Sequence, residues 1–123
     1  MWDLRPTAEY ERRLKQYVKK RPRETRAVLG NLKSFVEALN AGARPRDVRT
    51  GFIHPEPGGV LAVTEQGAGK STIPLRLYVY PHPDGGTLHL VTLGGKATQA
   101  EDVLFCKRSI EFLRTEGQVP DVQ

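Results

Sequence analysis

Two stretches near the start of the chain carry apolar residues at helical spacing. They predict one helix from about Ala8 to Lys20 and a second from about Arg23 to Leu39. Pro22 separates them, because the residue before a proline avoids the helical backbone conformation. The two helices are therefore expected to form an antiparallel pair. Their apolar positions are Tyr10, Leu14, Tyr17, Val18, Val28, Leu32, Phe35, Val36 and Leu39.

Beyond Thr50 the apolar pattern changes to the alternation that is typical of β-strands. Strands are expected at residues 59–64, 73–80 and 87–93. The connections between them are rich in glycine and proline, which favours an antiparallel meander.

The two sides of the middle strand differ in character, because successive side chains of a strand point to opposite faces. The apolar side is expected to pack on the helices. The other side carries Arg76, Tyr78 and Tyr80, and it is expected to face a groove or solvent. The apolar side consists of Ile73, Leu75, Leu77 and Val79.

A short edge strand at residues 2–5 and a last helix from about Gln99 to Arg114 complete the prediction. The expected fold class is α+β, in the order β-α-α-β-β-β-α. A helical hairpin packs on a small antiparallel sheet, and a C-terminal helix closes the fold. The length of 123 residues suits one domain, expected at residues 1–115, with a flexible tail at residues 116–123.

The positive charge of the chain is concentrated in its first half. The net charge is +5, yet residues 1–50 carry 13 Lys and Arg against 6 Asp and Glu, whereas residues 51–123 carry 6 against 8. Such a cluster attracts a polyanion. A solvated helix face and an acidic protein partner are the alternatives. The basic residues that lie off the apolar stripes are Arg12, Arg13, Lys15, Lys19, Arg23 and Arg26.

Cysteine content and hydropathy restrict the class of protein. Cys106 is the only cysteine, so the chain cannot form an intramolecular disulfide. No apolar run approaches the roughly 20 residues that a membrane helix needs, and none resembles a signal peptide. We therefore expect a cytoplasmic protein that makes no membrane contact.

Several catalytic and cofactor motifs can be set aside. Residues 67–72 (GAGKST) lack the first glycine and the following helix of a phosphate-binding loop. The three histidines have no metal-ligand spacing, so no metal or cofactor is expected. Among them His54 is the best functional candidate, whereas His82 is expected to be exposed and His89 to be an ordinary sheet residue.

A cationic group around the sheet remains as the candidate site. Arg76 stands mid-strand, where its guanidinium can bind a phosphate in bidentate fashion or pair with a carboxylate. Lys96 follows two glycines at a strand end, and Tyr78 and Tyr80 could stack on a base. The predicted site residues of this group are Lys70, Arg76, Tyr78, Tyr80, Lys96 and Gln99.

At these residues the chain resembles the RelE/ParE toxin superfamily, closest to its HigB-like, phage-derived branch. The resemblance covers about residues 2–113. It rests on the helical hairpin that begins near residues 8–10 (AEY), on residues 75–80 (LRLYVY) and on residues 87–107 (TLHLVTLGGKATQAEDVLFCK). The last segment is the most specific, because a strand, glycine, Lys96 and Gln99 precede Asp102 at the start of the closing helix.

The resemblance implies a toxin that cleaves mRNA on the ribosome without a metal, by attack of a ribose 2′-oxygen on the adjacent phosphate. It implies catalytic roles for Arg76 and Lys96, with His54 or Lys70 assisting proton transfer. It also implies a cognate antitoxin and a toxin that is monomeric when free. A DNA gyrase inhibitor and an inactive binding module are the alternatives. The residues expected to contact ribosomal RNA are Arg12, Arg13, Lys19, Arg23 and Arg26.

Overall fold

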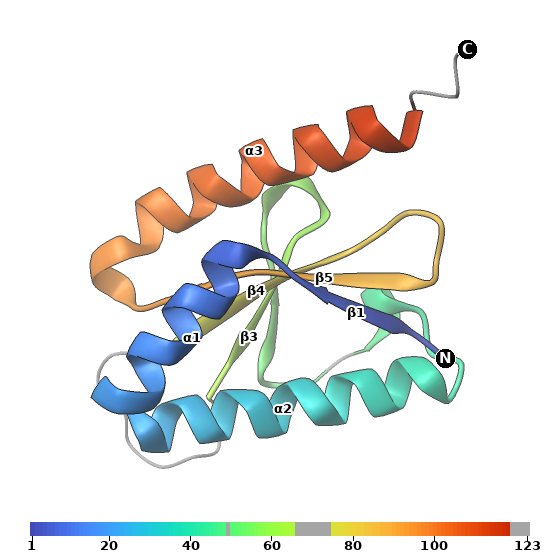
Figure 1. Ribbon diagram of the computed structural model, residues 1–123. Coiled ribbons are helices and arrows are strands. Elements are labelled where there is room, and N and C mark those ends of the chain that lie inside the picture. Colours follow the sequence, from blue (N-terminus) through green and yellow to red (C-terminus); the bar gives the residue numbers. More distant parts are fainter. Residues whose placement is uncertain (49, 66–74, 119–123) are drawn as a thin grey trace.

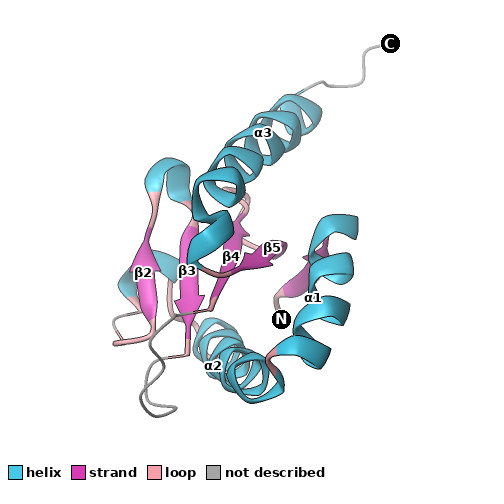
Figure 2. Cartoon of the chain, turned by 90° about the vertical axis from the view of Figure 1, so that its left-hand side faces the viewer, coloured by secondary structure: helices cyan, strands magenta, loops and turns pink. Residues whose placement is uncertain are grey.

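The computed structural model describes residues 1–48, 50–65 and 75–118. A five-stranded sheet lies between two layers of helix: a helical hairpin on one face and the C-terminal helix on the other (Figures 1 and 2). The helices are α1 (Ala8–Lys20), α2 (Pro22–Asn40) and α3 (Gln99–Gln118). The strands are β1 (Asp3–Pro6), β2 (Ile53–Pro55), β3 (Leu61–Thr64), β4 (Arg76–Pro81) and β5 (Thr87–Gly94).

The sheet has the strand order β1-β5-β4-β3-β2. Strands β2 to β5 form the antiparallel part, which includes the predicted meander. Strand β1 pairs in parallel with β5, so the sheet is mixed and not wholly antiparallel as predicted. The α+β class is confirmed.

The helical hairpin begins and breaks where the sequence indicates. The Thr7 hydroxyl accepts a hydrogen bond from the Tyr10 amide at 2.9 Å and donates one to the Val91 carbonyl at 2.6 Å, so the cap also fixes α1 to β5. Pro22 occupies the first position of α2, where its missing amide hydrogen costs nothing. Helix α3 continues to Gln118, beyond the predicted end near Arg114.

The face of the sheet toward α1 and α2 holds the larger core, as expected. Leu75, Leu77 and Val79 are fully buried there against the apolar stripe of α2. The expected position of Ile73 on this face lies outside the described residues.

The prediction for the opposite face is wrong. Tyr78 and Tyr80 are only 1% and 4% exposed, because Cys106 and Ile110 of α3 pack over them. The apolar side of α3 requires an apolar surface, and this face of the sheet provides it. Neither tyrosine faces solvent.

A bulge in β5 explains why its side chains do not alternate strictly. Tyr78 pairs with Thr92 but the next residue, Val79, pairs with Leu90, which leaves Val91 as the extra residue. The shift places Val91 in the core under α3 while Leu90 remains in the core under the hairpin.

Strand β2 was predicted as loop, because three residues are too few for an alternation to show. Ile53 is buried and pairs with Val63. Within the described residues, no helix is both long and apolar enough to cross a bilayer.

Candidate nucleic-acid interface

Exposed cations gather at one end of the molecule. They come from the C-terminal half of α1, the first turns of α2 and the link between β5 and α3, which meet at the left of Figure 1 and face the viewer in Figure 2. Within the described residues none of these side chains makes an ion pair. We call this surface the basic end, and it consists of Lys15, Lys19, Lys20, Arg23, Arg26 and Lys96.

Buried polar contacts hold the link that carries Lys96 against α1. Arg13 donates to the Leu93 carbonyl at 3.0 Å and lies 3.3 Å from the Asp102 carboxylate. The Thr98 hydroxyl donates to the other oxygen of Asp102 at 2.8 Å. The end of β5, the link and the start of α3 are thereby fixed to α1, which holds the segment that carries Lys96 and Gln99 in place.

Asp102 is 1% exposed, and burial raises the pKa of its carboxyl above the ordinary value, although Thr98 and Arg13 both favour the charged form. Gly94 gives this carboxylate the room it needs. A β-carbon at residue 94 would collide with the Asp102 carboxylate and lie 2.6 Å from the Thr98 hydroxyl.

Two arginines predicted to contact RNA form ion pairs with carboxylates of the protein itself. Arg13 is 13% exposed and bonds Glu9 and Asp102, so it is a structural residue. Arg12 is exposed but pairs with the same Glu9 at 2.7 Å. The hydrogen bond from Arg12 is the main cause of a lowered pKa at Glu9.

Arg76, predicted as a phosphate clamp, has a carboxylate partner. Its guanidinium lies 3.5 Å from Glu56, and the two side chains are 25% and 17% exposed. Glu56 follows β2, twenty positions before Arg76, and nothing in the sequence indicates the pair. A phosphate at Arg76 would have to compete with the Glu56 carboxylate.

The two predicted stacking residues and the remaining lysine do not join the basic end. Tyr78 and Tyr80 are covered by α3 and cannot stack on a base in this arrangement. Lys70 lies outside the described residues. Lys96 is exposed, and Gln99, three positions later, is half-buried.

The histidines lie elsewhere. His54 is exposed on the edge strand β2. His82 and His89 contact each other, with 3.2 Å between their ring nitrogens, and His89 stacks on Tyr80. His82 is therefore half-buried and not simply exposed as expected. Burial, followed by the neighbouring His82, lowers the pKa of His89.

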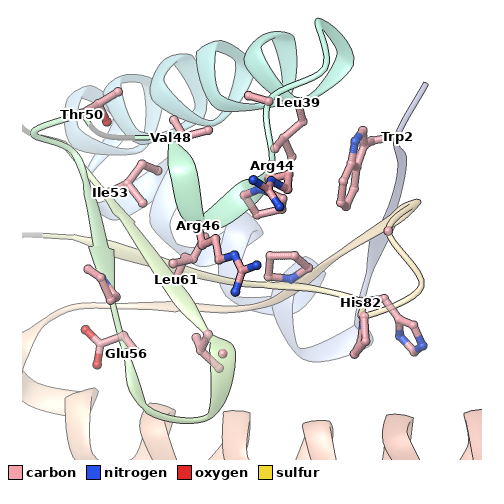
Figure 3. Close-up of a pocket in the computed structure, with 18 of the residues that line it drawn as sticks. Trp2, Leu39, Arg44, Arg46, Val48, Thr50, Ile53, Glu56, Leu61 and His82 are labelled. Carbon is pink, nitrogen blue, oxygen red and sulfur yellow. The ribbon is translucent and has the colours of Figure 1, made fainter.

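A large groove lies at the opposite end of the sheet (Figure 3). This groove of about 1300 Å³ runs between the end of α2, the following loop and the β4–β5 hairpin. Leu39, Ile53 and Leu61 form apolar walls, and Trp2 and Arg46 extend over it in Figure 3. No motif in the sequence indicates it, because its residues come from distant parts of the chain: Trp2, positions between residues 39 and 61, and residues 81–85.

The described residues contain no group of three or more His, Cys, Asp or Glu side chains that could hold a metal ion. The basic end combines ammonium and guanidinium groups, and the Gln99 amide lies beside Lys96. Such groups bind phosphates and stabilise charge that develops on a phosphate.

No family model, no curated protein and no solved structure matches the chain.

Proposed function

We propose that the chain binds RNA through its basic end. The observation that carries the proposal is that three segments with exposed Lys and Arg residues lie at one end of the molecule, where these residues make no ion pair with any other described residue. Phosphate contacts of this kind supply most of the affinity of a protein for a nucleic-acid backbone. Glu11 and Glu101 are exposed in the same region, but they leave a clear excess of positive charge.

The finer proposal is that the domain is a RelE/ParE-like mRNA interferase, the toxin of a toxin–antitoxin pair, acting in the cytoplasm on ribosome-bound mRNA. The resemblance of residues 87–107 motivates it, and the exposed position of Lys96 beside Gln99 supports it. Lys96 would hold the scissile phosphate. Arg76 would join only after exchanging Glu56 for that phosphate.

The binding proposal is tested by the salt dependence of affinity for a short single-stranded RNA. Lys19→Gln/Lys20→Gln/Arg23→Gln should weaken binding and make the slope of log K against log salt shallower by roughly 0.7 per lost phosphate contact. Fluorescence anisotropy at several salt concentrations measures both quantities.

A control variant removes the same number of exposed cations from elsewhere, as Arg46→Gln/Arg108→Gln/Arg114→Gln. It should keep the wild-type slope. Equal effects of the two triple variants would mean that only net charge matters, and the basic end would then not be a binding site.

Cleavage is tested by inducing the wild type and Lys96→Ala in cells and mapping new 5′ ends by primer extension. New ends inside coding frames that the variant fails to produce would support the interferase. Growth arrest without new ends, combined with inhibition of supercoiling by purified protein, would favour a gyrase inhibitor. RNA binding without arrest or cleavage would leave a binding module.

A further inference from the structure

A second, smaller cavity lies between α3 and the connection from β2 to β3. Its volume is about 290 Å³, near the lower limit for small-molecule pockets and enough for a single ring with one substituent. Its lining residues include Val60, Val103 and Ile110, with charged side chains of α3 among the rest. None of the functions considered above makes use of it.

Tyr78 lines this cavity and carries an unused hydrogen-bonding group. Its side chain is 1% exposed, and within the described residues its hydroxyl has no hydrogen-bond partner. A buried hydroxyl in this condition destabilises the fold, and any molecule that supplies an acceptor recovers the loss.

The surroundings of Tyr78 keep its hydroxyl in the neutral form. Burial is the main cause that raises the pKa of Tyr78 to about 12; Arg76 opposes the shift, whereas Asp102, Glu56 and Cys106 contribute to it. Glu56 and Cys106 both line the cavity. The hydroxyl therefore stays protonated at neutral pH and is available as a donor.

Glu56 supplies an acceptor. One of its oxygens lies 3.5 Å from Arg76, so the pair carries no net charge and a neutral ligand fits best. A ligand N–H can bond the same carboxylate without displacing the arginine, because a carboxylate accepts several hydrogen bonds.

We propose that this cavity binds a small neutral molecule with an apolar ring and a carboxamide-like group, whose oxygen accepts from Tyr78 and whose N–H donates to Glu56. The ring contacts Val60, Val103 and Ile110. The proposal is independent of RNA binding, because none of its residues belongs to the basic end.

Benzamide is the probe, titrated into the full-length protein and followed by backbone amide NMR signals. Saturable shifts are expected at Gly58, Val103 and Lys107, but not at Gly42 or Arg46 of the large groove. Tyr78→Phe should weaken binding by about tenfold, because it removes one hydrogen bond without changing the ring.

Val103→Phe fills the cavity and should abolish the shifts, whereas Val48→Phe, in the large groove, should leave them unchanged. Thermal unfolding identifies any variant that fails to fold. The variants that do fold then test whether benzamide binds in the small cavity. Absence of saturable shifts in the wild type, shifts confined to the large groove, or equal affinity of Tyr78→Phe would each overturn the proposal.

Discussion

Arg12 and Arg13 stand next to each other and share Glu9, but their surroundings differ. Arg12 is exposed, and solvent screening leaves an exposed ion pair with little effect on stability. Arg13 is 13% exposed and neutralises Asp102, which is buried. Arg13→Ala should therefore lower the free energy of unfolding by about 3 kcal/mol, because it leaves a buried charge unpaired.

Urea unfolding measures this difference, with Arg12→Ala as the control. Arg13→Ala/Asp102→Ala should be more stable than Arg13→Ala alone, because the uncompensated carboxylate is removed as well. Equal losses for Arg12→Ala and Arg13→Ala would contradict the structural role of Arg13.

Residue 94 must be a glycine because the Asp102 carboxylate and the Thr98 hydroxyl occupy the space that a β-carbon would need. Alanine there would push against the Asp102 carboxylate and the Thr98 hydroxyl, both of which are fixed by hydrogen bonds. We expect Gly94→Ala to cost about 1–3 kcal/mol of folding free energy. Gly30→Ala is the matched control, because its β-carbon meets nothing within 4 Å in α2 and should stabilise the fold by roughly 0.5–1 kcal/mol. Both values follow from urea unfolding.

At the level of single residues, the sequence predicts which side chains are exposed better than it predicts which side chains form ion pairs with one another. It places Lys19, Arg23 and Lys96 correctly on the surface. It does not indicate that Arg76 meets Glu56 or that Arg13 meets Asp102, because such pairs depend on the packing of segments that are distant in the chain.

At the level of elements the helices were the most predictable part. The bounds of α1 agree with the prediction, since Thr7 and Pro22 mark its two ends locally. The bulge at Val91 and the short strand β2 were not predictable, because both are fixed by pairing with neighbouring strands.

The hairpin between β4 and β5 carries a pH-sensitive contact. His82 and His89 lie 3.2 Å apart, and burial, followed by the charge of His82, lowers the pKa of His89 below its ordinary 6.5. Arg5 lowers it as well, whereas Asp84 and Asp3 oppose the shift. The unfolded state therefore binds more protons than the folded state just below pH 6.5.

It follows that stability is complete above pH 6.5 and falls as the pH drops from that value toward the lower pKa of the folded state. Urea midpoints between about pH 7.5 and about pH 5 should show this loss. His89→Gln should remove that part of the slope, and His54→Gln, at an exposed position, should retain it. Identical slopes in the two variants would show that the histidine pair makes no contribution.

For the whole molecule, the main surprise is that both faces of the sheet are covered. The sequence shows apolar residues on one side of β4 and tyrosines on the other, and a tyrosine suits either a core or a surface. The apolar positions of the last helix, Cys106 and Ile110 among them, require a partner surface. Because α3 needs an apolar surface to pack on, the tyrosine side of β4 belongs to the core. This conclusion can be reached only when the last helix and the sheet are considered together.

The two layers of helix should differ in local stability. Helix α2 buries Val28, Leu32, Phe35 and Leu39 in the larger core. Helix α3 covers the small cavity, and it leaves Phe112 64% exposed. The buried hydroxyls of Tyr78 and Thr92, on the same side of the sheet, find no hydrogen-bond partner among the described residues.

Native-state hydrogen exchange should therefore show amides of α3 opening at a lower free energy than those of α2, β4 and β5, which should exchange only through global unfolding. Val103→Leu fills part of the cavity and should raise the protection of the α3 amides against exchange. The amides of α2 should still exchange only through global unfolding. Equal protection across both helices would mean that α3 unfolds with the rest of the molecule and that its imperfect packing does not weaken it locally.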